Sequence, residues 1–255
     1  MSLKALYLGS GQKLQVRADG PALRVDGSGR TPGRYPLSRL ARVISAEDVA
    51  WSTRGLVSCL KAGVPVVFLG SDGVPSGWCF GPRRRETTLA QLLREGLSQS
   101  EWDSKFSDWR RNAELKQAAA ALHYCGLAAG PTTIHAAEVS LFNHPRRRCG
   151  TGVAAHMCEL KGAASALIAR RVEIAVGDPA LIGYPRPGLH LTQIFGELMR
   201  WQLHGLIKRT HVAILRAPAE MRTAAILVER DSALLDAAAA EMLAGFEMWL
   251  RDWLL

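Results

Sequence analysis

The first 85 residues are dominated by short apolar stretches with a period of two. Residues 5–8 are apolar, and the pairs Leu14 and Val16, then Leu23 and Val25, alternate with polar neighbours. This alternation is typical of strands with one buried face. Glycine, aspartate and proline separate the stretches and supply the backbone shapes that tight turns need. The pattern therefore predicts a β-rich N-terminal region.

One short helix is predicted within this region. Ser52 can cap its first turn by accepting a backbone N–H bond, and Gly63 can end it in a left-handed conformation. Residues 64–69 follow as a continuous apolar run, which suits a strand covered on both faces. We therefore expect strand, helix and buried strand in succession.

After residue 85 the apolar positions follow a helical period instead. Trp102, Phe106 and Trp109 are spaced by four and three residues, so they share one helix face. Further helices are predicted over residues 159–176, 189–215 and 231–253. Prolines separate these segments, because proline cannot occupy the interior of a helix without disrupting it.

The two patterns together predict an α+β protein. We expect a β-rich dimerisation domain at residues 1–85, with sandwich-like sheets and one short helix. A linker at residues 86–95 should lead into an all-helical domain at residues 96–255.

Composition narrows the class of protein. Hydrophobic residues make up 48% and charged residues 22% of the chain, which is typical of a globular protein. No apolar run is long enough to span a membrane. The five cysteines form no Cys-x-x-Cys pair, so a zinc ribbon or a disulfide framework is not supported. We expect a cytoplasmic protein.

The charge favours an anionic partner. The formal net charge is +9, and nucleic acid is the commonest partner of so basic a chain. The whole surplus lies in residues 1–150, because residues 151–255 carry 11 basic and 11 acidic residues. Contacts to DNA in the last part of the chain must therefore come from local clusters.

Two triple-arginine runs are the main candidates for such contacts. Arg83, Arg84 and Arg85 stand at the junction between the predicted domains, and Arg146, Arg147 and Arg148 are expected in a loop between helices. The forked guanidinium of arginine binds phosphate oxygens bidentately. Contacts of this kind do not distinguish one base sequence from another. The alternative is a solvated face or structural ion pairing.

Several N-terminal motifs resemble those of one family. They are Leu6-Tyr7-Leu8, Tyr35-Pro36-Leu37, Trp51-Ser52-Thr53 and the segment from Gly63 to Phe68. In these the chain resembles the CRISPR-associated integrase, the first of the Cas proteins. The resemblance covers roughly the first 95 residues, and Gly177 to Tyr184 resembles the family segment that leads into the metal site.

This resemblance implies a fold, an activity and partners. It implies a DNA-handling subunit of spacer acquisition that acts on double-stranded or branched DNA. It also implies a homodimer joined through the β domains and assembly with the family's small ferredoxin-like partner. Family members hold Mg²⁺ or Mn²⁺ through a glutamate, a histidine and an aspartate, ligands that suit such hard ions.

Carried over residue by residue, the family's ligand set is largely replaced. Glu138 matches the early glutamate and is the candidate catalytic residue. The histidine position falls on Pro185 or Arg186, and the aspartate position on Thr192 or Ile194.

A rearranged metal site remains an alternative. His190 and Glu197 are seven residues apart, so they would share a helix face, and with Glu138 they could form a trio of ligands. Glu197 could instead pair with Arg200, three residues away. Two hypotheses stay open: a DNA-binding subunit of spacer acquisition without catalysis, or an active Mg²⁺- or Mn²⁺-dependent endonuclease or integrase.

Overall fold

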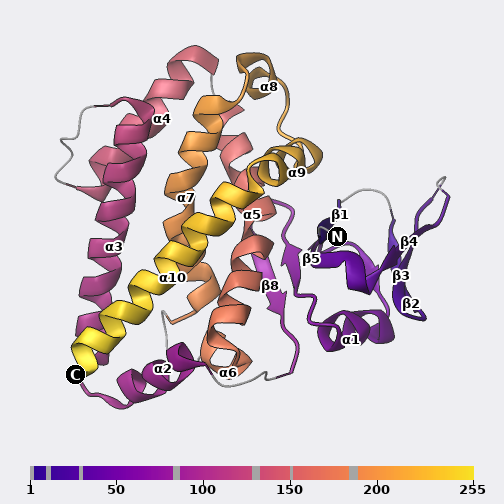
Figure 1. The fold of residues 1–255 in the computed structure, drawn as a ribbon. Helices are drawn as coiled ribbons and strands as arrows, with labels where there is room; N and C mark the ends of the chain where they lie inside the picture. The colour runs from indigo at the N-terminus through magenta and orange to yellow at the C-terminus, as the bar shows by residue number, and fades with distance from the viewer. Residues whose placement is uncertain are drawn as a thin grey trace.

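The computed structural model describes residues 3–9, 13–28, 31–82, 87–127, 133–149, 152–183 and 189–255. The side chains of residues 144 and 147–149 lie outside this description. The described part confirms the predicted fold class, a β-rich N-terminal region followed by a helical one (Figure 1). None of the described helices is long and apolar enough to cross a membrane.

The described residues of the N-terminal region form two four-stranded sheets. The inner sheet, next to the helical region, has the order β1 (Lys4–Leu8), β5 (Leu40–Ala46), β7 (Val66–Leu69) and β8 (Pro75–Cys79). The outer sheet has the order β4 (Gly33–Pro36), β3 (Ala22–Asp26), β2 (Gln15–Asp19) and β6 (Ala50–Trp51). Strands β1, β5 and β7 are parallel, and β8 runs antiparallel to β7.

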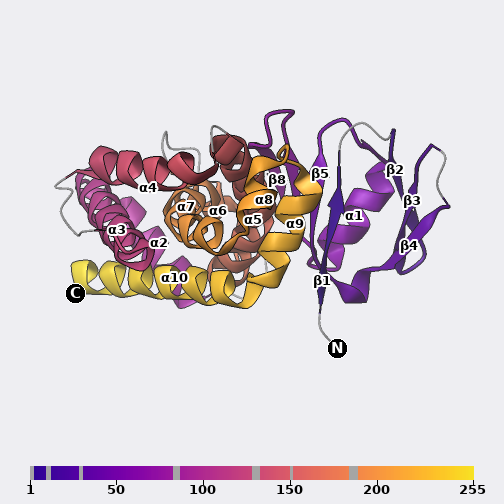
Figure 2. The same cartoon turned by 90° about the horizontal axis from the view of Figure 1, so that it is seen from above.

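Helix α1 (Thr53–Lys61) forms where the sequence predicts it. The Ser52 hydroxyl accepts a hydrogen bond from the Gly55 backbone N–H at 3.0 Å. Gly63 follows the helix with a φ of 68°, a left-handed conformation that glycine adopts without steric cost. Figure 2 shows α1 between the inner and the outer sheet, where Cys59 packs into their shared core.

The inner sheet is buried on both faces, as the apolar run at 64–69 predicts. Strand register places Tyr7, Ile44, Val67 and Trp78 in one row across the four strands. This row faces helix α5 (Gly152–Val176), and Ala166 and Ala169 of α5 are buried in the same cluster. The alternate row packs toward α1 and the outer sheet.

Helix α5 approaches the inner sheet so closely that one position requires glycine. A Cβ on Gly162 would lie 2.4 Å from the backbone carbonyl oxygen of Gly73, in the turn between β7 and β8. No side chain fits at that distance. Gly162 therefore sets how near the helical region sits to the sheet.

The helical region starts earlier than expected. Its elements are α2 (Thr88–Ser98), α3 (Trp102–Cys125), α4 (Ile134–Cys149), α5, α6 (Pro179–Ile182), α7 (Leu191–Arg209), α8 (Val212–Arg216), α9 (Met221–Arg230) and α10 (Ser232–Leu254). Helix α2 covers most of the stretch 86–95, which we expected to be a linker. It packs on α5 and α10.

Two local predictions in this region were wrong. The helix expected over 189–215 is divided into α7 and α8, because Thr210 is extended and the His211 side chain caps α8 by accepting from the Ala213 N–H. The loop expected at Arg146 to Arg148 is the end of α4, which continues past Pro145. Packing of α4 against α3, α5, α7 and α8 outweighs the missing proline N–H.

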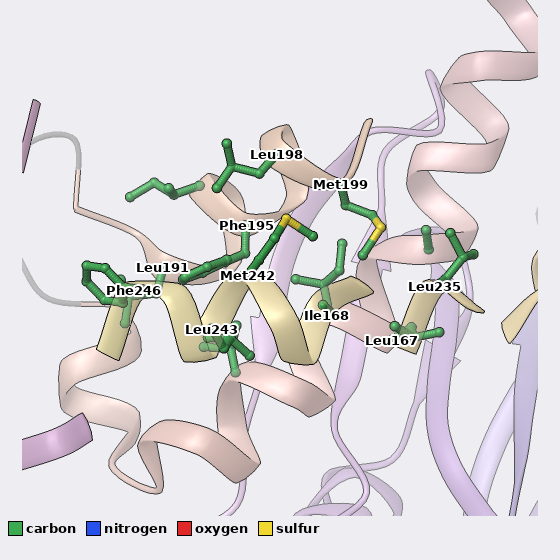
Figure 3. Close-up of a cluster of buried hydrophobic side chains, with 14 of the residues drawn as sticks. Leu167, Ile168, Leu191, Phe195, Leu198, Met199, Leu235, Met242, Leu243 and Phe246 are labelled. Atoms are coloured by element: carbon green, nitrogen blue, oxygen red, sulfur yellow. The ribbon is translucent and has the colours of Figure 1, made fainter. Parts of the chain in front are cut away.

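The core of the helical region lies where α5, α7 and α10 meet. Figure 3 shows Leu167 and Ile168 of α5, Phe195 and Met199 of α7, and Met242 of α10 clustered there. Aromatic rings extend this core toward α3. Trp102, Phe106 and Trp109 share one face of α3, as predicted, and their rings stack in sequence. The Trp109 ring also makes tilted contacts with Phe195 of α7 and Phe246 of α10.

Candidate functional site

Arg200 of α7 lies at the centre of a carboxylate cluster. Its Nη1 donates to Glu138 of α4, and its Nη2 donates to Glu114 of α3 at 2.5 Å. Its Nε lies 3.5 Å from an Oε of Glu197, one turn earlier in α7. Two nitrogens of the guanidinium therefore donate to carboxylates from other helices, whereas Nε has only this longer ion-pair contact and no hydrogen-bond partner within the described structure. We call Glu114, Glu138, Glu197 and Arg200 the Arg200 cluster.

The cluster is partly closed to solvent. The side chain of Arg200 is 17% exposed and that of Glu114 18%, whereas Glu197 is 44% exposed. The Arg200 guanidinium also lies 4.6 Å from the ring centroid of Trp201, a favourable cation–π contact. Burial alone would lower the pKa of Arg200, but Glu114 and Glu138 raise it above its ordinary value. The arginine is a fixed cation.

His204 lies one turn beyond Arg200 and is buried, with 5% of its surface exposed. Its ring meets Phe142 edge-on, at a centroid distance of 5.1 Å. Burial, together with the charges of Arg200 and Lys161, lowers the pKa of His204 to about 4. The imidazole is therefore neutral at physiological pH.

A single helix face brings these α7 side chains together. Glu197, Arg200, Trp201 and His204 have the spacing i, i+3, i+4 and i+7, which places them on one side of a helix. The pairing of Glu197 with Arg200, one of the two sequence alternatives, is confirmed. Sequence reasoning missed Arg200 as the centre of the cluster, and it missed Glu114 altogether.

His190, the third candidate ligand, has other neighbours. It precedes α7 as its N-cap residue, and its ring lies 4.6 Å from the ring of Trp78 on β8. Gly183 lies beside the same ring. Burial lowers the pKa of His190. The described contacts join Glu138 and Glu197 through Arg200 and leave His190 at the junction with the inner sheet.

The positions that replace the family's other ligands are core positions or undescribed. Ile194 is buried in the main helical core. Thr192 is 2% exposed, and its hydroxyl has no hydrogen-bond partner within the described structure. Pro185 and Arg186 lie outside the described residues.

The candidate DNA contacts can be placed only in part. Arg146 is exposed near the end of α4, where a cation is favoured by the helix dipole. Arg147 and Arg148 are on the same helix, but their side chains lie outside the description, as do Arg83, Arg84 and Arg85 entirely. Among the other arginine pairs, Arg171 binds Asp236, whereas Arg110 and Arg111 are exposed on α3.

Comparison with known proteins identifies the family. Residues 7–124 match the family described as "CRISPR associated protein Cas1". The matched stretch contains all of β2 to β8 and runs on through α2 to the last turn of α3. Over this stretch the chain is a member of the Cas1 family. No curated protein matches it by sequence.

Solved structures show the Cas1 fold over nearly the whole chain. A CAS1 protein from Thermotoga maritima superimposes with a TM-score of 0.71 at 11% identity, covering 97% of each chain. TtCas1 in a DNA complex gives a TM-score of 0.65 at 11% identity, over 95% of this chain and 91% of that one. A casposase bound to integration product gives a TM-score of 0.59 at 13% identity, over 92% of this chain and 82% of that one.

The Arg200 cluster does not fit the divalent metal that the Cas1 family implies. One carboxylate oxygen of Glu114 and one of Glu138 accept hydrogen bonds from the guanidinium of Arg200, which stands where a metal ion would have to bind. A metal ion bound to these carboxylates would be repelled by the positive charge of Arg200. Among the residues that the structure describes, no three His, Cys, Asp or Glu side chains are arranged to hold a metal ion.

Proposed function

We propose that this Cas1-family chain is a DNA-binding subunit of CRISPR spacer acquisition that performs no metal-dependent cleavage at Glu138. The family match over residues 7–124 and the Cas1 fold over 97% of the chain support the role in spacer acquisition. TtCas1 is known in a DNA complex and the casposase on its integration product.

The position of Arg200 carries the non-catalytic part of the proposal. By the family resemblance, Glu138 is our candidate for the early glutamate of the ligand set. Its carboxylate forms an ion pair with an arginine from α7. A divalent ion stabilises the charge that develops in phosphodiester chemistry. The guanidinium of Arg200 has only N–H donors and no lone pair to offer. It can neutralise Glu138, but it cannot bind and activate a water molecule as a divalent ion does.

The net charge of +9 and the two triple-arginine runs support DNA binding. We propose that Arg83 to Arg85 and Arg146 to Arg148 contact backbone phosphates of double-stranded or branched DNA. Such contacts release counterions, so binding should weaken steeply as salt rises.

The assembly is also part of this proposal. We expect a homodimer joined through the N-terminal sheets and, in the cytoplasm, association with the small ferredoxin-like partner of spacer acquisition. A related chain is known within a Cas6-RT-Cas1–Cas2 complex. Light scattering of the purified chain tests the dimer, and a monomeric mass at micromolar concentration would contradict it.

The decisive experiment measures cleavage and binding on the same DNA. The purified chain is incubated with fork and branched DNA, with and without Mn²⁺, and anisotropy and denaturing gels are recorded. We expect salt-sensitive binding and no cut strand. Mn²⁺-dependent cleavage that is lost in Glu138→Gln would overturn the non-catalytic part and support the alternative, an active Mg²⁺- or Mn²⁺-dependent enzyme.

A charge-matched pair of variants locates the DNA contacts. Changing Arg146, Arg147 and Arg148 to alanine should weaken binding and lower the salt slope of log K by about 2 to 3, because each phosphate that is no longer neutralised reduces the slope by roughly 0.9. The control changes three exposed cations of the N-terminal region, Arg39, Arg54 and Lys61. Equal weakening in both variants would show that only net charge matters, and no binding at low salt would overturn the proposal entirely.

A further inference from the structure

We propose that Arg200 is the resident cation of its carboxylate cluster and that its positive charge excludes divalent metal ions from Glu114, Glu138 and Glu197. On this view the cluster is a latent metal site that one side chain keeps closed. The inference deepens the non-catalytic part of the proposed function and is independent of DNA binding.

Three carboxylates from three helices form ion pairs with one guanidinium. Glu114 and Glu138 accept hydrogen bonds from its two Nη atoms, and Glu197 lies 3.5 Å from its Nε. Carboxylate oxygens are also the ligands that hard divalent ions prefer. With Arg200 between them, these side chains are not arranged to hold a metal ion. In this chain the point where they meet is held by Arg200 of α7.

The charges within the cluster do not balance. The three glutamates carry three negative charges, and Arg200 supplies a single positive charge among them. Lys161 lies near enough to act on His204, but no ion pair of Lys161 with these glutamates occurs among the described residues. Removing Arg200 therefore leaves an excess of negative charge at a partly enclosed place, which favours uptake of another cation.

The surroundings are suited to such uptake. Glu197 and Glu138 are 44% and 30% exposed, so an ion can enter from solvent. His204 is buried one turn beyond Arg200 on the same face of α7, and its Nδ1 has no hydrogen-bond partner within the described structure. A neutral imidazole is a further potential ligand for Mn²⁺.

The test is Mn²⁺ binding to the full chain, monitored by electron paramagnetic resonance of the free ion. The wild type should bind no Mn²⁺ that depends on Glu138. Arg200→Met removes the charge but keeps an unbranched side chain over Trp201. It should bind one Mn²⁺ per chain, about tenfold or more tightly than any site of the wild type, as expected for a site with three carboxylates.

Two further variants distinguish charge from shape. Arg200→Lys keeps the positive charge and should remain unable to bind Mn²⁺. Adding Glu138→Gln to Arg200→Met should abolish the gain. If Arg200→Met does not fold in metal-free buffer, Arg200→Gln carries the same expectation, because its amide still donates to a carboxylate.

The results separate this inference from the proposed function. Glu138-dependent Mn²⁺ binding by the wild type would overturn the inference, and so would failure of both neutral variants to bind the ion. Neither measurement contains DNA. A wild type that binds no Mn²⁺ at Glu138 but also no DNA would leave the inference standing and remove the proposed DNA-binding role.

Discussion

His204 should make the protein sensitive to mild acid. The imidazole is buried between α4 and α7, against Phe142 and next to Arg200. Burial and two nearby cations hold its pKa at about 4, below the ordinary value of 6.5. In the unfolded chain the imidazole regains the ordinary pKa. Between these two values, the unfolded state therefore binds a proton that the folded state does not.

The direction and the size of the change in the free energy of unfolding follow from this pKa difference. Because the unfolded state binds more protons, the free energy of unfolding falls as the pH is lowered through 6.5 and levels off below about 4. A gap between 6.5 and about 4 corresponds to about 3 kcal/mol at roughly 1.36 kcal/mol per tenfold step in acidity. That is a large part of the roughly 5–15 kcal/mol typical of a folded domain.

The assay is urea unfolding of the wild type and of His204→Phe at several pH values between 7 and 4. Phenylalanine keeps a ring against Phe142 but cannot take up a proton. We expect the two free energies to diverge as the pH falls, with the variant gaining about 3 kcal/mol relative to the wild type by the lower end. The control is His135→Phe, at an exposed position of α4.

Parallel pH curves for the wild type and His204→Phe would refute this reasoning. They would mean that the folded protein takes up the proton at no cost, for example through movement of Arg200 or Lys161 away from the imidazole. Divergence in the His135 control as well would show that any histidine has this effect.

Two further tests, one of them with a matched control, probe the packing between the sheet and the helices. Gly162→Ala should lower the free energy of unfolding by about 1–3 kcal/mol, because its Cβ would clash with the Gly73 carbonyl oxygen. Gly196→Ala, also within a helix but with nothing near the added methyl, should raise it by about 0.5–1 kcal/mol; equal effects of the two in urea unfolding would contradict the close approach. Tyr7→Phe should cost about 1 kcal/mol, because the hydroxyl donates to Glu229 of α9 at 3.0 Å, and an unchanged urea midpoint would mean that water replaces this bond.

The sequence predicted best those features that depend on neighbouring residues. The two ends of α1, at Ser52 and Gly63, were predictable because helix capping and left-handed backbone are properties of single residues. The buried strand at 66–69 was predictable because both of its faces are apolar. The break at Thr210 was missed because it contains neither proline nor glycine and rests on side-chain hydrogen bonds.

The Arg200 cluster could not be found in the same way. Glu138 is 62 residues from Arg200 in the sequence, and Glu114 is 86 residues away. Only Glu197 is a local neighbour, and its pairing was the one part that helix periodicity suggested. Helices α3, α4 and α7 meet because their apolar faces pack together. This packing brings the charged side chains into contact, and their distant positions in the sequence give no sign of it.

Helix α5 has a consequence for the order in which the chain can fold during synthesis. The row of Tyr7, Ile44, Val67 and Trp78 on the inner sheet is covered by α5, which leaves the ribosome only after residue 176 is made. Until then this apolar face has no partner within the chain, and an uncovered sheet is prone to aggregation. We therefore expect truncations before α5 to need a chaperone, and the complete chain to unfold in one transition because neither region has a finished core without that helix.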